Sequence, residues 1–451
     1  MICLGLDVGS SSVKGAILDL EQREVRGIIQ QPFPAPISGL PAGFFEVDPQ
    51  AVVAVVESVV LNLLLDAPDA AALFCSGQMA GVVLVDQAGQ PLTNYLSWRD
   101  QRTQRPCESH PSYLDALRSR WTNNELADVG NELQAGSASS LLFWLAQNRR
   151  LPPNATPVTV ADFAIGRLCN GLPTMHPTQA VGLLNLHAGT WHRPAFDTLG
   201  LAEVRWPQLT DHRQPMGQMK IAGRTLPCHA SFGDQQCALR GVGLTRQELS
   251  LNISTGSQVS RRTATFEGGP YQTRCYFDGD FLNTVTHLPA GRSLNVLCDL
   301  LTELARSQGV TLANPWPFIA ENAASSDGGG LTVDLAFFAG PLGNRGRLEG
   351  ITTENLSIGN LFHAAFRNMA DNYFLIANRL VSDRTGLQLV CSGGLTRSVP
   401  ILRQMIQDRF AMPLRESAAA EETLLGLLEI ARSVYLNETS KMHVENLGKP
   451  S

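Results

Sequence analysis

The chain contains 451 residues, which is enough for two or three domains that each bury a hydrophobic core. Hydrophobic residues make up 44% and charged residues 17%, which is typical of a globular protein and excludes a disordered or fibrous one. The formal net charge is -6 and no run of lysine or arginine stands out, so nucleic acid and anionic membranes are poor partners.

The first predicted turn carries an unusual set of polar residues. Residues 4–15 read LGLDVGSSSVKG, a short apolar strand followed by a turn and a second strand. Gly9 permits a sharp turn that points backbone N–H groups inward. Lys14 adds a positive charge for phosphate, and Asp7 at the strand end can face a magnesium ion through water. Further donors come from three consecutive hydroxyls, Ser10, Ser11 and Ser12.

A second turn of the same chemistry decides how the first is interpreted. The first matches neither GxxxxGK[ST] nor GxGxxG, which disfavours a P-loop protein and a dinucleotide fold, and alone it equally fits an ordinary surface hairpin. More than half the chain later, residues 252–260 read NISTGSQVS, preceded by FGDQQ with the isolated carboxylate Asp234. Asp234 alone could simply cap a helix starting at Gln235. Together, the two turns and this carboxylate are the parts needed to hold a nucleotide's phosphates and transfer one.

The remaining elements alternate between strands and helices. A helix is predicted over residues 49–65, starting at Pro49 with Asp48 as its N-cap. Further elements, in chain order, are strands at 71–76 and 82–86 around the turn SGQMAG, helices within 111–150, a loop-rich part at 152–215, helices at 293–307 and 359–384, and a strand LQLVCSGG before a helix from about residue 399. Strands followed by helices in each half predict an α/β protein of two similar lobes whose hydroxyl turns face each other across a cleft.

The cysteines and the chain start indicate a cytoplasmic protein. The nine cysteines are scattered, odd in number and without a CxxC spacing, which favours reduced thiols over a zinc site or a disulfide framework. The first strand starts at residue 2, which leaves no room for a signal peptide. The most apolar window, residues 51–65, is broken by Glu57 and Asn62, and we expect it to be too short to span a bilayer.

Read together, these segments resemble the FGGY family of carbohydrate kinases, within the actin-like ATPase superfamily. The resemblance runs almost end to end through LGLDVGSSSVKG, GFFEVDP, CSGQMAGVVLVD, LSWRDQRT, ADFAIGRLCNG, FGDQQCALRGVG, NISTGSQVS, CSGGLTRSVPILRQMIQ and EETLLGLL. Among its branches, NISTGSQ, SGQM, FWLA, CNGLP and the overall length look most like sedoheptulokinases. Xylulose kinases and glycerol kinases are more distant.

The resemblance implies a fold and an activity. The fold is two actin-like (ribonuclease H-like) lobes with a catalytic cleft between them. Residues 1–241 would carry the sugar site, the first phosphate loop and the base, and residues 242–451 the second phosphate loop and the adenosine site. The activity is ATP-dependent phosphorylation of the terminal hydroxyl of a ketose, sedoheptulose or a related heptulose, with xylulose, glycerol or another polyol as alternatives. From a different class, an actin-like ATPase without a sugar and a catalytically silent sugar sensor remain, although GDQ and SGQM count against the former.

The family's motifs also imply roles for individual residues. Asp234 would accept the proton of the attacking hydroxyl, and Asp7 together with Asp234 would face Mg²⁺. The resemblance assigns ATP to Gly9, Ser10, Ser11, Ser12, Lys14, Thr255, Gly256, Gly291, Asn295, Gly394 and Ser398. It assigns the sugar to Gln78, Met79, Trp98, Asp100 and Gln235.

Several of these residues could instead have ordinary structural roles. Trp98 is equally well read as a core tryptophan, and Asp100 with Arg102 as a structural ion pair. Gly291 and Asn295 align loosely, and ordinary turn and helix roles fit them as well. At two positions the chain departs from the family: Ser398 stands where many members have Asn, and Ala80 where xylulose kinases usually have His. The expected partner is a small sugar; relatives commonly form homodimers, but the sequence shows no interface.

Overall fold

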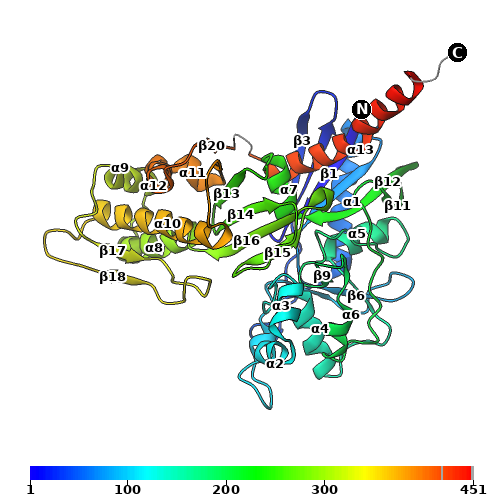
Figure 1. Cartoon of the computed structure of the whole chain (residues 1–451), viewed down its shortest axis with the longest axis horizontal. Helices are drawn as coiled ribbons and strands as arrows, with labels where there is room; N and C mark the ends of the chain where they lie inside the picture. Colours follow the sequence, from blue (N-terminus) through cyan, green and yellow to red (C-terminus); the bar gives the residue numbers. More distant parts are fainter. Residues whose placement is uncertain (418–419, 448–451) are drawn as a thin grey trace. The chain divides into compact units, whose positions relative to one another are not determined.

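The computed structural model describes residues 1–417 and 420–447, with side chains up to Leu436. Two compact units make up the chain, and their elements are labelled in Figure 1. Unit 1 comprises Met1–Gly243, Thr273–Phe281 and Ala419–Ser451, and unit 2 comprises Leu244–Gln272 and Leu282–Ala418. The sequence placed a boundary after residue 241, and in the structure the first exchange between units follows Gly243. Two later segments of the chain also belong to unit 1.

Unit 1 is built on a six-stranded mixed sheet with the order β11-β12-β5-β1-β2-β3. The strands β1 and β2 form an antiparallel hairpin, while β1, β5 and β12 run parallel to one another. The bounds are Ile2–Val8 for β1, Ser12–Asp19 for β2, Glu24–Pro32 for β3, Leu73–Gly77 for β5, Pro215–Ile221 for β11 and Arg224–Gly233 for β12.

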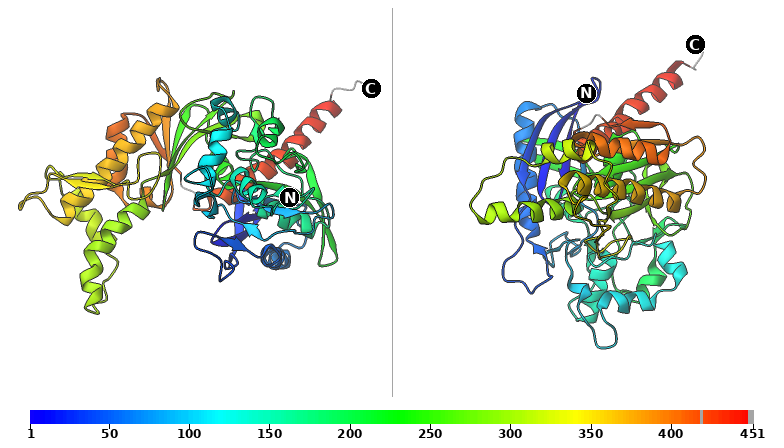
Figure 2. Two further views of the ribbon diagram at one scale, coloured as in Figure 1. Left: turned by 90° about the horizontal axis from the view of Figure 1, so that it is seen from below. Right: turned by 90° about the vertical axis from the view of Figure 1, so that its left-hand side faces the viewer.

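Helix α1, Pro49–Asp66, covers one part of this sheet. Its start confirms the prediction, since Asp48 is the N-cap and accepts a hydrogen bond from the Gln50 backbone N–H at 2.9 Å. By length and apolarity these 18 residues could cross a membrane, contrary to the expectation from residues 51–65. However, Val52, Val56 and Val59 are fully buried and α1 packs on β1, β2 and β3 (Figure 2, right). We therefore describe α1 as a core helix of unit 1.

The other elements of unit 1 lie mostly between β5 and β12 in the chain. They include the two-stranded sheets β4–β7, β6–β8 and β9–β10. Their bounds are Glu46–Val47 for β4, Val83–Val85 for β6, Tyr95–Leu96 for β7, Arg102–Gln104 for the 3₁₀ turn η1, Tyr113–Arg120 for α2, Asn123–Asp128 for α3, Ala138–Gln147 for α4, Thr156–Val158 for β8, Val160–Leu168 for α5, Leu184–Asn185 for β9, Thr190–Trp191 for β10, Arg193–Asp197 for α6, Asp234–Gly241 for α7, Phe277–Gly279 for η2 and Glu422–Leu447 for α13.

Unit 2 repeats the arrangement of unit 1. The strands β13 and β14 form an antiparallel hairpin, and β13 also pairs in parallel with β19, as β1 does with β5. Its sheet has the order β15-β16-β14-β13-β19-β20. The bounds are Glu248–Ile253 for β13, Ser257–Thr263 for β14, Gln272–Cys275 for β15, Phe281–Leu288 for β16, Gln388–Ser392 for β19 and Leu414–Glu416 for β20. The predicted α/β class with two similar sheets is confirmed.

Helices α8, α10 and α12 of unit 2 correspond to predicted helices, whereas α9 and α11 were not predicted. Helix α10, Ile358–Leu380, supplies much of the core through residues such as Phe362, Phe366 and Tyr373. Helix α8, Gly291–Ser307, joins this core through Leu294 and Leu297 in its first half, whereas Leu300 and Leu304 in its second half are exposed. Figure 2 draws this unit from two further sides. The remaining elements are Trp316–Ala324 for α9, Thr332–Asp334 for β17, Arg347–Glu349 for β18, Gly394–Ser398 for α11 and Pro400–Phe410 for α12.

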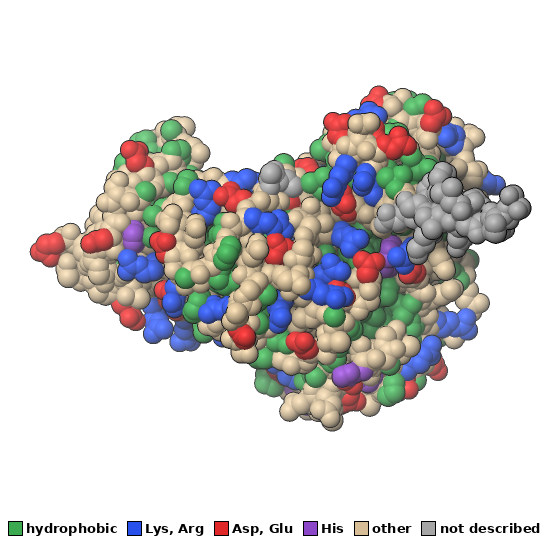
Figure 3. Space-filling view, turned by 45° about the horizontal axis from the view of Figure 1, so that its top comes forward, with side chains coloured by type: hydrophobic (Ala, Val, Ile, Leu, Met, Phe, Trp, Pro, Cys, Tyr) green, Lys and Arg blue, Asp and Glu red, His purple; other side chains and the backbone are tan. Residues whose placement is uncertain are grey.

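The molecular surface carries charges of both signs. On the face in Figure 3, basic and acidic side chains are interspersed over the described residues, without a large area of either sign. This distribution agrees with the modest negative net charge of the chain.

Two glycines let α13 pack directly on α7. A Cβ atom at Gly426 would lie 1.9 Å from the Cys237 carbonyl oxygen, and one at Gly241 would lie 2.0 Å from the Glu422 carbonyl oxygen. The backbones of the two helices therefore approach more closely than any side chain allows. Because α7 begins at Asp234, this contact fixes the helix that carries the predicted base.

We expect Gly426→Ala to destabilise unit 1 by about 1–3 kcal/mol, the usual cost of forcing an extra group into a packed contact. The matched control is Gly171→Ala, since a Cβ at Gly171 meets nothing within 4 Å. Chemical denaturation of both variants checks the prediction. Equal stability of Gly426→Ala and the control would contradict the described packing.

Candidate active site

Asp7 lies near the carboxyl end of β1, beside the turn that the sequence singled out. The Gly9 N–H donates to the Ser12 carbonyl oxygen at 3.0 Å and closes this turn between β1 and β2. Asp7 pairs with Lys14 across the hairpin and accepts a hydrogen bond from Ser76 Oγ at 3.0 Å. Burial raises the pKa of Asp7, while Ser76 and the charge of Lys14 act in the opposite direction.

Asp234 follows directly after the carboxyl end of β12. Strand β5 lies between β1 and β12, and its Ser76 is in register with Asp7 on one side and with Phe232 on the other. The carboxyl ends of the three parallel strands therefore bring Asp7 and Asp234 to the same edge of the sheet, which is where α/β sheets usually bind ligands. Burial, and then the negative charge of Asp7, raise the pKa of Asp234 to about 6.

The structure agrees only in part with the alternative that Asp234 simply caps a helix. Helix α7 begins at Asp234 itself, with Gly233 as its N-cap, and Asp234 Oδ1 accepts a hydrogen bond from the Gln235 backbone N–H at 2.7 Å. A bond to the next residue places the carboxylate at the first turn of α7. One such bond does not explain why two carboxylates with raised pKa values lie at one sheet edge.

Two residues that the sequence did not single out hold Asp234 in place. The Gln179 side-chain amide donates to the carbonyl oxygens of Gly77 and Phe232, at 3.1 and 2.9 Å, and so joins the ends of β5 and β12. Thr178 Oγ1 accepts a hydrogen bond from the Gly233 N–H at 3.0 Å. Both lie in the loop-rich part of the chain, where no motif marks them.

Two of the expected sugar-side residues, Gln78 and Met79, lie at this edge of unit 1. Gln78 accepts a hydrogen bond from the Tyr95 hydroxyl at 3.1 Å and donates to the Gly9 carbonyl oxygen at 3.3 Å, so it joins the SGQM turn to the first loop. Met79 packs next to the base, since its Sδ would lie 2.7 Å from a Cβ at Gly233. Trp98 is 37% exposed, which does not fit the alternative of a core tryptophan.

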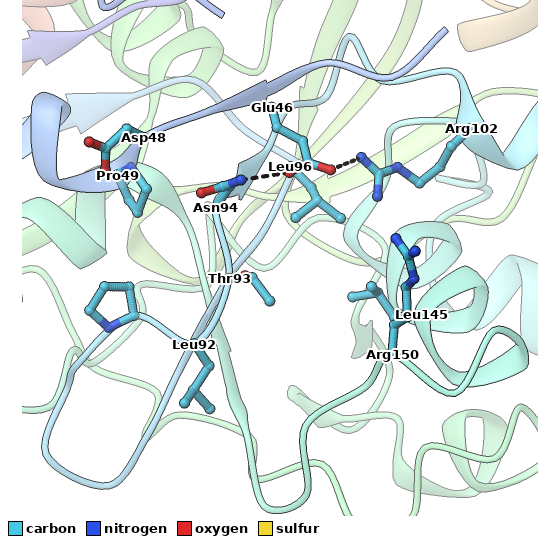
Figure 4. Close-up of a pocket in the computed structure, with 11 residues that line it drawn as sticks. Glu46, Asp48, Pro49, Leu92, Thr93, Asn94, Leu96, Arg102, Leu145 and Arg150 are labelled. Carbon is cyan, nitrogen blue, oxygen red and sulfur yellow. Dashed lines mark hydrogen bonds and ion pairs between the residues drawn. The ribbon is translucent and has the colours of Figure 1, made fainter. Parts of the chain in front are cut away.

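Asp100 adopts the structural role that the sequence left as its alternative. Its side chain is fully buried; Oδ2 accepts from the Phe45 N–H at 2.7 Å and from Arg102 Nη2 at 2.8 Å. Arg102 also donates to Glu46, and Figure 4 shows this pair at the wall of a pocket of about 470 Å³. Asn94 donates to the other oxygen of Glu46 at 2.8 Å (Figure 4). The hydrogen bonds of Asp100 thus tie it to the backbone and to Arg102.

Lys14 is held by an ion pair within unit 1. Its Nζ lies 2.7 Å and 2.9 Å from the two carboxylate oxygens of Glu421, just before α13. Both side chains are partly exposed, so the pair contributes little to stability. A phosphate group that binds Lys14 would have to share its ammonium group with Glu421 or displace that carboxylate.

The unit 2 residues assigned to ATP gather at one end of the β13–β14 hairpin. Thr255 and Gly256 are exposed at its turn. Gly291, at the start of α8, donates from its N–H to the Ser254 carbonyl oxygen at 3.1 Å, and a Cβ there would lie 2.9 Å from that oxygen. Gly291 therefore touches the second loop, while Asn295 is exposed one turn further along α8.

A glycine pair after β19 completes this end of unit 2. Gly393 has a φ of +93°, and a Cβ there would lie 2.3 Å from the Ile253 carbonyl oxygen, so the chain passes directly over the end of β13. The sequence did not single out Gly393. A Cβ at the assigned Gly394 meets nothing within 4 Å, which leaves open space at the start of α11. Ser398 Oγ donates to the Leu395 carbonyl oxygen at 3.3 Å.

The acidic residues at the unit 1 sheet edge fit a magnesium ion. No cluster of three or more His, Cys, Asp or Glu side chains within the described residues could hold a metal ion. Mg²⁺ does not need such a cluster, because it commonly binds one or two carboxylates together with water and substrate phosphates. Asp7 and Asp234 supply carboxylate oxygens of the kind that Mg²⁺ prefers.

Comparison with known proteins gives the family. The sequence signature of the N-terminal domain of the FGGY family of carbohydrate kinases matches residues 2–241, more than half of the chain. The chain belongs to the FGGY family. Its matched part contains β1, the first loop, Asp7 and Asp234.

Named relatives are glycerol and xylulose kinases. The glycerol kinase of Marinomonas sp. (strain MWYL1) is 26% identical over 267 residues, covering 53% of this chain and 50% of that protein. The xylulose kinase of Lactococcus lactis subsp. lactis (strain IL1403) is 24% identical over 311 residues, covering 65% and 60%. The chain thus spans about half the length of several curated relatives that it matches. These relatives do not support the expected closeness to sedoheptulokinases.

Solved structures confirm the fold over nearly the whole chain. The xylulose kinase from Lactobacillus acidophilus matches with a TM-score of 0.82 at 19% identity, covering 96% of this chain and 89% of that one. The gluconate kinase from Lactobacillus acidophilus gives 0.80 at 18% identity, covering 96% and 89%. The glycerol kinase of Plasmodium falciparum with ADP gives 0.80 at 18% identity, covering 95% and 88%. At this identity, the likeness shows the fold alone.

The raised pKa of Asp234 predicts the pH dependence of any reaction in which it acts as a base. The carboxylate must be unprotonated, so kcat/KM should fall as the pH is lowered through about 6. A steady-state pH profile measures the midpoint. A profile that stays flat through this pH would contradict a role for Asp234 as the base.

Because the space around Gly394 is open, we predict that a larger side chain there lowers the affinity for ATP without lowering the stability of the fold. Gly394→Val should leave the melting temperature unchanged, because nothing in the protein lies within 4 Å of the new Cβ. If the nucleotide fills this space, the variant should weaken ATP binding by about tenfold or more. Calorimetric titration with ATP tests this, and unchanged affinity would remove Gly394 from the ATP site.

Proposed function

We propose that this protein is a kinase that transfers the γ-phosphoryl group of ATP to a hydroxyl group of a sugar or polyol. The single observation that carries the proposal is the pair of partly buried carboxylates, Asp7 and Asp234, which have raised pKa values and lie at one sheet edge beside the hydroxyl-rich first loop. Membership of the FGGY family and the matching hairpin turn at Thr255 and Gly256 in unit 2 support it.

In the proposed reaction, Asp234 accepts the proton of the acceptor hydroxyl as its oxygen forms a bond to the γ-phosphorus. The bond between the γ-phosphorus and the bridging oxygen breaks, and ADP leaves. Because such transition states are loose, positioning and charge stabilisation dominate and the base removes the proton late. Mg²⁺, when bound, would neutralise phosphate charge near Asp7 and Asp234. The residues Ser10, Ser11, Ser12, Lys14, Thr255 and Gly256 would hold the phosphates.

The acceptor is proposed at the level of its class. The sequence pointed to the terminal hydroxyl of a heptulose, whereas the named relatives favour the alternatives, xylulose and glycerol or another polyol. Residue 80, which follows Met79, is an alanine, so no histidine side chain is available there. Gln78, Met79, Trp98 and Gln235 would line the acceptor. We propose a cytoplasmic enzyme, in line with nine free cysteines.

A screen for acceptor-dependent ADP release tests the proposal directly. Purified protein with Mg-ATP is assayed against sedoheptulose, xylulose, glycerol, other polyols and gluconate. We expect one or a few strong acceptors and little ADP release without them, because a sugar kinase transfers to its acceptor rather than to water. ADP release that does not depend on any acceptor would favour an ATPase instead.

The variant Asp234→Asn should lose about 10²–10⁴-fold in kcat, the usual contribution of a positioned base, while ATP binding remains. The same change should raise the melting temperature at neutral pH, because the raised pKa means that ionised Asp234 destabilises the folded protein above pH 6. This gain should disappear as the pH is lowered toward the ordinary range of Asp. Turnover at the wild-type rate would show that Asp234 is not the base.

A further inference from the structure

A buried arginine contacts the residue next to the proposed base. Arg274 lies in β15, and its side chain is 8% exposed. Its Nε donates to the carboxylate of Glu132, which is 4% exposed, and its Nη1 donates to the side-chain carbonyl oxygen of Gln235. We call this chain of contacts, Glu132–Arg274–Gln235, the arginine bridge.

The backbone around Arg274 is anchored to both partners of the bridge. The Thr273 N–H donates to the Gly130 carbonyl oxygen at 2.9 Å, two residues before Glu132. Gln236, next to Gln235 on α7, donates from its amide to the Cys275 carbonyl oxygen at 3.2 Å. The residues on either side of Arg274 are therefore tied to the Glu132 loop and to α7, which holds the guanidinium between them.

The chemistry of the bridge fixes the orientation of Gln235. A guanidinium group only donates hydrogen bonds, so the amide end of Gln235 that faces Arg274 must be its carbonyl oxygen. This choice removes the freedom of the amide to flip. Because Gln235 follows Asp234 directly, the orientation of its amide decides which end is presented beside the base.

The bridge also constrains the charge of the acceptor. An arginine beside the base could anchor a carboxylate or phosphate of an acidic acceptor. Here Glu132 already forms a buried ion pair with Arg274, so the pair as a whole is neutral. Arg274 therefore brings no net positive charge to the acceptor site.

We propose that Arg274, held by Glu132, is a positioning residue that orients Gln235 toward an uncharged sugar or polyol at the acceptor site. This inference rests on the proposed function, since it takes the acceptor to lie beside Asp234. It adds two statements to that function. Arg274 acts through Gln235, and sugar acids are poor acceptors.

Acceptor binding without nucleotide is the primary readout, because it does not require transfer. Isothermal titration calorimetry with glycerol, xylulose, sedoheptulose and gluconate should show binding of a neutral acceptor, and weaker binding of gluconate. Arg274→Met should weaken binding of the neutral acceptor by about 10- to 100-fold, the loss expected for a hydrogen bond to a charged group. In turnover, KM should rise by a similar factor and kcat should change less. A preference of the wild type for gluconate would overturn the proposal.

A double-mutant cycle tests whether Arg274 acts through Gln235. If it does, Arg274→Met combined with Gln235→Ala should bind the acceptor as weakly as Gln235→Ala alone. If the role of Arg274 is purely structural, the fold-losses of acceptor affinity in the two single variants should multiply in the double variant. That result would overturn the proposal. Arg274→Lys keeps the charge but not the planar fork, so it should restore only part of the affinity.

Two further variants separate positioning from folding. Arg240→Met is the matched control, since Arg240 lies on α7 with Gln235 and donates at 3.0 Å to Asp278, which belongs to the same segment as Arg274. Arg240→Met should leave the acceptor affinity within about twofold of the wild type. A loss of affinity as large as that in Arg274→Met would show that the effect comes from loosening the segment that both arginines hold, and not from the orientation of Gln235. Arg274→Met alone leaves Glu132 buried without its partner, so Glu132→Met with Arg274→Met removes both charges, a change that is often tolerated. This double variant should fold and still bind the acceptor weakly, whereas wild-type affinity in it would overturn the proposal.

The outcomes also distinguish this inference from the proposed function. A wild-type protein that binds a neutral acceptor but does not transfer phosphate would refute the kinase proposal while the cycle still tests the bridge. Conversely, an active kinase whose acceptor affinity does not change in Arg274→Met would refute only the bridge.

Discussion

The chemistry proposed for unit 1 depends on two partly buried carboxylates at neighbouring strand ends. Loss of water raises the pKa of both Asp7 and Asp234, and the negative charge of Asp7 raises the pKa of Asp234 further. Two such carboxylates lower the stability of the folded protein, and neither the packing of the core nor the backbone hydrogen bonds of the sheet require them. Perturbed carboxylates of this kind are typical of sites that bind a cation or move a proton. The cost is thus evidence for chemistry at this edge.

The surroundings of Asp234 hold it from several directions. Gln179 ties together the strand ends beneath it, and the glycine contact between α7 and α13 fixes the helix that it begins. Arg274 reaches the next residue, Gln235, from a segment much later in the chain. Three parts of the chain that are distant in sequence therefore converge on one helical turn, which is how a preorganised site is built.

The sequence predicted the elements that depend on local chemistry. The cap of α1 at Asp48, the two hydroxyl-rich hairpin turns and the isolated carboxylate at Asp234 were all visible, because each is a short pattern with one physical cause. Arg274, Glu132 and Gln179 were not, because their roles arise only when loops far apart in the chain meet. Gly393 was missed in favour of its neighbour, since only the fold shows which glycine crosses β13. The acceptor also stays beyond the sequence, because those same loops shape its site.

A crystal structure with a non-hydrolysable ATP analogue, Mg²⁺ and the best acceptor tests the central claim most directly. The account predicts the acceptor hydroxyl within about 2.6–3.2 Å of the Asp234 carboxylate, the reach of a general base. It also predicts that the metal ion lies beside Asp7 and the terminal phosphate. An acceptor bound away from Asp234, or a metal ion held by other residues, would contradict it.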